Sequence, residues 1–183
     1  MKVIVAITGA SGAIYARQCL EKLLVAAEVD EIALVVSDMG REVMAYEGVE
    51  LPVSEKIVRY ANDDMFSPVA SGSASWDAMI IVPASMGSVG RIASGVSLSL
   101  IERAADVMLK ERRRLIVVVR ETPYSLIHLR NMTTLTEAGA IVLPASPSFY
   151  AHPEGLEQAT MTVVERIIAH AGIQMPHYSF SGK

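Results

Sequence analysis

The amino-terminal segment limits the folds open to this chain, because an apolar run, a turn of small residues and a helical pattern follow one another directly. Residues 1–7 are apolar apart from one lysine, residues 8–13 read Thr-Gly-Ala-Ser-Gly-Ala, and a periodic pattern starts at Ile14. In an open α/β sheet, such a strand–turn–helix unit points backbone N–H groups and the positive end of the helix at an anion. Two interpretations of the turn stay open: a phosphate site, or an ordinary turn in which Ser11 caps the helix.

This turn does not complete a known nucleotide motif. It lacks the G-x-G-x-x-G spacing and the lysine of a P-loop. It begins like the nicotinamide turn of short-chain dehydrogenases, but Ala13 and Tyr15 stand where that pattern needs glycine. No tyrosine is followed four residues later by lysine, so the catalytic pair of those enzymes is absent as well.

Apolar segments alternate with helical patterns along the chain. The expected strands are residues 1–7, 31–36, 78–82, 115–119 and 140–143. The expected helices are residues 13–26, 40–46, 98–113, 125–138 and 156–171, with a short helix within residues 51–60 and another running through Val89 and Ile92. This order predicts an α/β fold with a mainly parallel sheet and helices on both faces.

Polar turns follow four of the expected strands, at residues 8–13, 37–38, 85–88 and 120–123. Right-handed crossovers bring the carboxyl ends of parallel strands to one edge of the sheet, so these turns should meet there. Ligands of open α/β sheets bind at that edge, near the point where the strand order reverses. We therefore expect the functional site there.

Composition restricts the class of protein. The 183 residues are 51% hydrophobic and carry a net charge of −4. This length fits one domain over residues 1–183. No apolar run reaches the roughly 20 residues of a membrane span. The acidic net charge does not suggest a nucleic-acid partner. Cys19 is the only cysteine, which fits a reducing cytoplasm and a buried side chain, and no zinc-like spacing occurs.

Several motifs occur in an order typical of one family. They are Gly-Ala-Ser-Gly-Ala from Gly9, Pro-Ala-Ser-Met from Pro83, Glu-Arg-Ala-Ala-Asp-Val from Glu102, Lys-Glu-Arg-Arg from Lys110, Arg-Glu-Thr-Pro from Arg120, His-Leu-Arg-Asn-Met from His128, and Phe149-Tyr150. With these motifs the chain resembles the UbiX/Pad1 family of flavin prenyltransferases, from Lys2 to about Ile173.

The resemblance implies a three-layer αβα Rossmann-like flavoprotein fold and FMN as cofactor. It implies transfer of a dimethylallyl group from dimethylallyl phosphate to N5 and then C6 of reduced FMN, without a metal. The prenylated FMN would pass to a UbiD-type decarboxylase. Members of the family are usually dodecamers, with the flavin site at subunit contacts.

The resemblance also implies roles for residues of this chain. The flavin contacts fall on Gly9, Ala10, Ser11, Ser37, Ser85, Met86, Gly87, Ser88 and Arg120. The prenyl-phosphate contacts fall on Lys110, Arg120, Tyr150 and Arg166, and the catalytic residues on Ser11, Glu47, Lys110 and Glu121. Some members carry lysine at the position of Arg166, and certain members place a carboxyl-terminal tryptophan near the prenyl pocket. This chain has only Trp76, and its tail reads Met-Pro-His-Tyr-Ser-Phe from Met175.

The residue chemistry agrees with a phosphate clamp that uses cations. Arg120, Arg166 and Lys110 can donate several hydrogen bonds to a phosphate dianion, and neutralising a departing phosphate lowers the barrier to C–O cleavage. Metal-dependent prenyltransferases use a D-D-x-x-D run, whereas here Ser67 follows Asp63-Asp64 where the third aspartate should stand. Each residue also has a structural interpretation, such as Lys110 compensating a helix dipole or Tyr150 packing at an interface.

Two other functions remain open. A flavin-dependent cysteine decarboxylase of the phosphopantothenoylcysteine type shares this fold, but it needs an early catalytic histidine and a P-x-M-N run. No histidine precedes His128, and Pro83 is followed by Ala-Ser-Met-Gly. The other alternative is a non-catalytic FMN-binding carrier or an accessory subunit of a decarboxylase.

Overall fold

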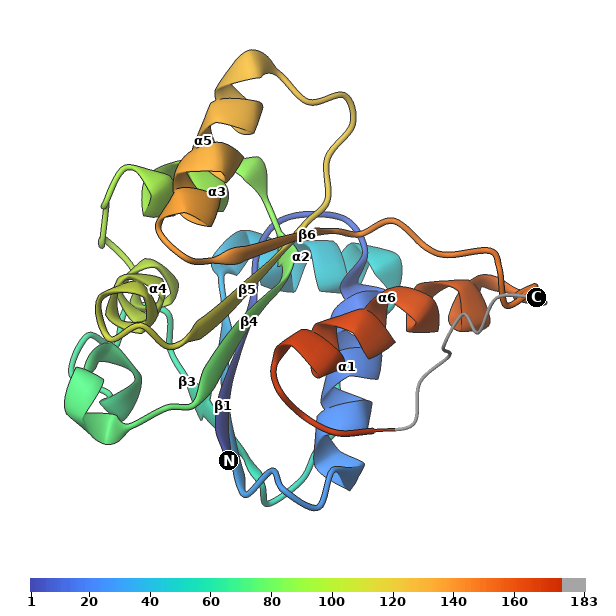
Figure 1. Cartoon of the computed structure of the whole chain (residues 1–183). Helices are drawn as coiled ribbons and strands as arrows, with labels where there is room; N and C mark the ends of the chain where they lie inside the picture. Colours follow the sequence, from blue (N-terminus) through green and yellow to red (C-terminus); the bar gives the residue numbers. More distant parts are fainter. Residues whose placement is uncertain (176–183) are drawn as a thin grey trace.

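A single parallel sheet forms the centre of the molecule (Figure 1). The computed structural model describes residues 1–175. In these residues six strands pair in the order β3-β2-β1-β4-β5-β6, and every pair is parallel. Their bounds are β1 Lys2–Ile7, β2 Glu31–Val36, β3 Ile57–Tyr60, β4 Ala78–Ala84, β5 Arg114–Val119 and β6 Ile141–Pro144. The mainly parallel sheet expected from the alternation of elements is confirmed.

Helices cover both faces of this sheet, which gives the three layers of an αβα fold (Figure 1). They are α1 Ala13–Val25, α2 Asp38–Glu47, α3 Met86–Ala93, α4 Leu100–Lys110, α5 Leu126–Glu137 and α6 Leu156–His170. Helices α1 and α6 pack against one face, and α3, α4 and α5 pack against the other. The Rossmann-like architecture is therefore confirmed.

Each face of the sheet has its own apolar core, because successive side chains of a strand point to opposite faces. Val3, Val5 and Ile7 of β1 face α1 and α6, whereas Ile4 and Ala6 face α3 and α4. Strands buried on both faces are almost wholly apolar, which explains why their segments were readable from the sequence. Cys19 is fully buried in the α1 layer, as expected.

The short helix expected within residues 51–60 is wrong, since Ile57–Tyr60 forms strand β3. This strand adds to the outer edge of β2, with Ile57 opposite Ile32 and Tyr60 opposite Val35. Pairing with β2 satisfies backbone groups that would otherwise be exposed at a sheet edge, and Ile, Val and Tyr suit a strand. A helix this short gains little stability of its own.

The end of α4 also differs from the sequence expectation. The helix stops at Lys110 rather than continuing to residue 113, because Arg112 adopts a φ of 56° and turns the chain into β5. Two short 3-10 helices, Pro68–Ala70 and Gly72–Ala74, lie between β3 and β4. Over residues 1–175, no helix is both long enough and apolar enough to cross a membrane.

Candidate active site at the carboxyl edge of the sheet

The strand order reverses between β1 and β4, and the turns after these two strands are bonded to each other. The Thr8 hydroxyl donates to the carbonyl oxygen of Pro83 at 2.9 Å and accepts from the backbone N–H of Ser85 at 2.8 Å. Thr8 is 2% exposed. These bonds fix the first turn, residues 8–12, against the start of α3 at the place where open α/β sheets bind ligands.

Two glycines let the start of α2 approach the end of β1 closely. A Cβ on Gly9 would lie 2.6 Å from Cβ of Met39, and one on Gly40 would lie 2.8 Å from the carbonyl oxygen of Ile7. Real Cβ atoms do not approach other atoms so closely, so both positions require glycine. Ser37 ends β2 as the N-cap of α2, and its hydroxyl accepts from the N–H of Gly40 at 3.0 Å.

Glu47 occupies the anion position at the start of α1. Its carboxylate accepts from the backbone N–H of Gly12 at 2.8 and 3.1 Å and from the N–H of Ala13 at 2.7 Å. The Ser11 hydroxyl is near enough to the same carboxylate to help lower its pKa. Gly12, with a φ of 108°, is the N-cap, and no side chain caps the helix from that position. Gly12 rather than Ser11 is therefore the cap, so that interpretation is wrong, and the Glu47 carboxylate occupies the N–H groups of Gly12 and Ala13. That the turn contacts a phosphate stays a prediction.

The surroundings of Glu47 keep it ionised. Partial burial alone would raise the pKa of this carboxyl, but the bonds from Ser11, Gly12 and Ala13 and the positive charge of Arg120 outweigh burial and lower it below the ordinary value. At neutral pH the carboxylate can therefore accept a proton. Arg120 also acts on Tyr15, whose pKa is raised by burial and lowered in part by the guanidinium.

These groups line a cleft of about 830 Å³. Ser11 and Gly12 come from the first turn, Glu47 from the end of α2, and Arg120 from the end of β5. The far wall is formed by the start of α6, including Leu156 and Thr160. The volume lies within the range of cofactor and substrate sites, and the cleft combines apolar walls with a few convergent polar groups. The structure thus brings Ser11, Glu47 and Arg120, which the sequence named as site residues, to the same cleft.

The start of α3 offers a second polar surface at the same edge. The Ser85 hydroxyl caps the helix by accepting from the N–H of Ser88 at 3.3 Å, and the two hydroxyl groups lie 3.1 Å apart. The first turn of α3 contains no acidic residue. By contrast, α1 receives Glu47 and α2 carries Asp38 in its first turn. Of these three helices, α3 alone therefore presents its amino terminus without a carboxylate, as the binding of a phosphate requires.

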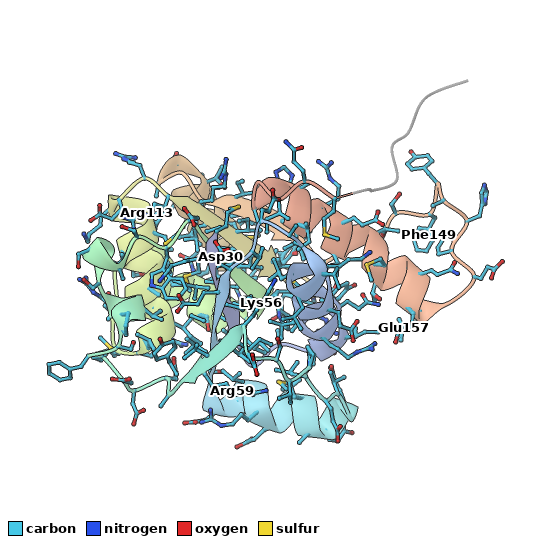
Figure 2. The ribbon with its side chains drawn as sticks, turned by 90° about the horizontal axis from the view of Figure 1, so that it is seen from below. Asp30, Lys56, Arg59, Arg113, Phe149 and Glu157 are labelled. Carbon is cyan, nitrogen blue, oxygen red and sulfur yellow. The ribbon has the colours of Figure 1, made fainter. Side chains whose placement is uncertain are left out.

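Other predicted site residues lie away from the cleft within one chain. Lys110 ends α4 at the amino edge of the sheet, where its ammonium pairs with Glu111. Strand β5 separates that edge from Arg120 and spans roughly 20 Å. Figure 2 labels Arg113, which follows Lys110 by three residues in the sequence. One chain thus does not bring Lys110 and Arg120 together.

Tyr150, Arg166 and Glu121 do not line this cleft. Tyr150 lies 71% exposed in the loop before α6, next to Phe149, which Figure 2 shows at the outer end of that loop. Arg166 lies on α6, 3.3 Å from Nε2 of His170, and lines a smaller hollow of about 320 Å³ beside β6. Glu121 accepts from the N–H of Thr122 at 2.9 Å. The tail from residue 176 lies outside the described residues.

The sequence prediction missed two residues of the site. Thr8 bonds the two turns, and Tyr15 is 7% exposed, lines the cleft and donates to the carbonyl oxygen of Ala145 at 3.4 Å. Tyr15 lies in the first turn of α1, directly after the turn of residues 9–12, and this position beside the predicted ligand turn was the available signal. In residues 1–175 no group of three His, Cys, Asp or Glu side chains is placed to hold a metal ion.

Comparison with known proteins assigns the class of this fold and site. The Flavoprotein family model matches residues 1–172. The flavin prenyltransferase UbiX of Thermoplasma acidophilum is 45% identical over 176 residues, which cover 94% of this chain and 96% of that protein. The chain therefore belongs to the flavoprotein family, in its UbiX flavin prenyltransferase branch, and the resemblance noted in the sequence is confirmed.

Solved structures agree with this assignment. The crystal structure of AnUbiX (PadA1) in complex with FMN and dimethylallyl pyrophosphate is 38% identical, with a TM-score of 0.90 over 100% of this chain and 98% of that one. A dodecameric FMN-dependent UbiX-like decarboxylase from Escherichia coli O157:H7 is 35% identical, with a TM-score of 0.91 over both complete chains.

Proposed function

We propose that the protein transfers a dimethylallyl group from dimethylallyl phosphate to N5 and C6 of reduced FMN and so makes prenylated FMN for a UbiD-type decarboxylase. One observation carries this proposal. In a chain of the UbiX branch, Ser11, the ionised Glu47 and Arg120 converge on a single cleft at the reversal point of the sheet.

The chain's own residues fit FMN. The Gly9 turn lies close to α2 without side chains in the way, and the start of α3 offers hydroxyl and N–H donors for the phosphate. In this proposal Ser85, Met86, Gly87 and Ser88 hold the phosphate end. The other flavin contacts, Gly9, Ala10, Ser11, Ser37 and Arg120, hold the rest of the nucleotide.

The side chains of the cleft have distinct chemical roles. When bound, reduced FMN supplies the nucleophilic positions N5 and C6. Arg120 stabilises the negative charge that builds on the donor's phosphate as its C–O bond breaks. Ser11 orients the acceptor through its hydroxyl. Glu47, ionised at neutral pH, accepts the proton that must leave C6, either directly or by way of the released phosphate.

A second copy of the chain completes the phosphate clamp in this proposal. Lys110 lies at the edge opposite Arg120 in its own chain, and Tyr150 is exposed on a projecting loop. Exposed apolar side chains on α5 and its amino-terminal flank, including Leu126, Ile127 and Leu129, are available to bury between copies. We infer a dodecamer, in which Lys110 of one copy reaches the cleft of a neighbour, with Tyr150, Arg166 and Glu121 also serving the donor side.

The test is anaerobic incubation of the protein with reduced FMN and either dimethylallyl phosphate or dimethylallyl pyrophosphate, followed by mass spectrometry of the released flavin. A gain of one C5H8 unit with the monophosphate supports the proposal. Bound but unmodified FMN with both donors would identify the non-catalytic carrier instead. Addition of the product to an apo UbiD-type decarboxylase then tests whether it restores decarboxylation.

A further inference from the structure

An ion pair between α3 and α4 lies outside every role described above. Nε of Arg91 donates to a carboxylate oxygen of Glu102. The Glu102 side chain is only 4% exposed, whereas that of Arg91 is 48% exposed. A carboxylate is rarely buried so completely unless it is paired and hydrogen-bonded, because desolvation of the charge costs several kcal/mol.

Glu102 is held in one position by backbone donors. Its second oxygen accepts from the N–H of Leu98 at 2.9 Å and from the N–H of Ser99 at 3.0 Å, as part of the capping box that starts α4. A carboxylate held by two backbone donors can serve as a rigid acceptor for Arg91. The pair thus sets the direction of the arginine rather than only neutralising it.

The guanidinium of Arg91 is directed toward the first turn of its own helix. Nη2 lies 3.3 Å from the hydroxyl of Ser88, and Nη1 would lie 3.4 Å from a Cβ on Gly87. Gly87 is exposed and has no side chain, so the arginine lies beside the open face of this turn. Because Nε donates to Glu102, the N–H groups on Nη1 and Nη2 are the ones that lie beside the Ser85–Ser88 hydroxyl pair.

We propose that Arg91 binds the phosphate of FMN and that Glu102 is a positioning residue that orients the Arg91 guanidinium. The proposal rests on the placement of that phosphate at the start of α3 under the proposed function. An arginine offers paired donors that match phosphate oxygens, and it adds a charge that two serine hydroxyls and a helix amino terminus lack. Arg91 therefore determines selectivity for FMN over riboflavin, which has no phosphate.

The experiment measures the dissociation constants of FMN and riboflavin by quenching of flavin fluorescence, in wild type and in Arg91→Met, Arg91→Lys and Arg59→Met. Arg59 is an exposed arginine on β3, which two other strands separate from β4, and its replacement is the matched control for loss of one charge. Arg91→Met should weaken FMN binding about tenfold to a hundredfold and leave riboflavin binding unchanged. The FMN dissociation constant of Arg91→Lys should fall between those of wild type and Arg91→Met. Arg59→Met should bind both flavins as tightly as wild type.

Glu102→Gln tests the positioning role. It should weaken FMN binding about threefold to tenfold without changing riboflavin binding, and it should have no further effect in the Arg91→Met background. Raising the salt concentration should reduce the FMN preference of wild type more than that of Arg91→Met, because only wild type retains the extra ion pair. A purely structural pair would weaken both flavins alike.

The outcomes separate this inference from the proposed function. If wild type binds FMN no more tightly than riboflavin, the phosphate placement itself is wrong. If wild type prefers FMN and Ser88→Ala lowers that preference while Arg91→Met does not, Arg91 has no part in phosphate binding. If Glu102→Gln still weakens FMN binding in the Arg91→Met background, Glu102 does not act through the arginine.

Discussion

Both oxygens of the Glu47 carboxylate lie within 3.1 Å of the backbone nitrogen of Gly12, so the end of α2 caps the start of α1. Helix α1 is therefore stabilised by an acidic residue that lies 35 positions away in sequence. This contact joins the stability of the fold to the chemistry of the cleft, because the same carboxylate is the proposed proton acceptor.

Glu47→Gln should destabilise the protein by about 1 kcal/mol at neutral pH, because the start of α1 loses a charged acceptor. The pKa of Glu47 is lower in the folded chain than its ordinary value, so its contribution is present above the ordinary pKa of about 4.3 and is lost as pH falls through the folded pKa. Urea unfolding should show a difference between the two proteins at pH 7 that shrinks below pH ~4. A difference independent of pH would contradict the ionised carboxylate.

Ser11→Ala should leave FMN binding intact and slow prenyl transfer about tenfold to a hundredfold, because one hydroxyl that orients the acceptor is removed. Single-turnover assays followed by mass spectrometry, alongside flavin binding titrations, separate the two effects. Transfer at the wild-type rate would remove Ser11 from the mechanism.

Arg120→Met should lower prenyl transfer by more than about a hundredfold, since the cleft loses the cation that faces the departing phosphate. The pKa of Glu47 should rise at the same time, because Arg120 contributes to its lowering. Carboxyl-carbon NMR of protein labelled at glutamate can follow that titration. An unchanged titration would show that Arg120 and Glu47 do not interact.

Lys110→Met and Arg120→Met should complement each other if Lys110 acts on a neighbouring copy. Each variant alone should be almost inactive. Equal mixtures that are dissociated and reassembled should recover about a quarter of wild-type activity, because one site in four then receives both intact residues. Mixtures as inactive as the separate variants would place Lys110 outside the site.

Gly9→Ala should cost about 1–3 kcal/mol of stability, because its Cβ would lie 2.6 Å from Cβ of Met39 in packed surroundings. Gly155→Ala is the matched control, since no atom lies within 4 Å of a Cβ there. Thermal unfolding of both variants should show the larger decrease in Tm for Gly9→Ala. Equal shifts would mean that α2 can move away from β1.

The parallel sheet and the edge that carries the site were predictable because the signals are local. Runs such as Leu115–Val119 are apolar throughout, and small polar turns follow them, so strand positions and their common edge follow from chain connectivity. Strand β3 was not predictable, because Ile57–Tyr60 becomes a strand through pairing with β2 rather than through its own pattern.

The contacts of the site were less predictable than its members. Nothing within residues 8–13 shows that Glu47 would accept hydrogen bonds from the N–H groups of Gly12 and Ala13, because these bonds depend on how α2 packs. Similarly, the role proposed for Lys110 cannot be read from one chain, since it lies at the edge of the sheet opposite Arg120. The packing of elements distant in sequence, rather than any local pattern, brings Glu47 and Arg120 to the turn that holds Ser11.

The bonds that Thr8 makes to Pro83 and Ser85 have a consequence for selectivity. They keep the first turn and the start of α3 at a constant separation before any nucleotide arrives. A molecule that contacts both the first turn and the start of α3 must span this fixed separation, since neither element can move apart without breaking a buried hydrogen bond. In the proposed function, a nucleotide that contacts both the first turn and the start of α3 therefore meets a spacing that is already set in the unliganded protein.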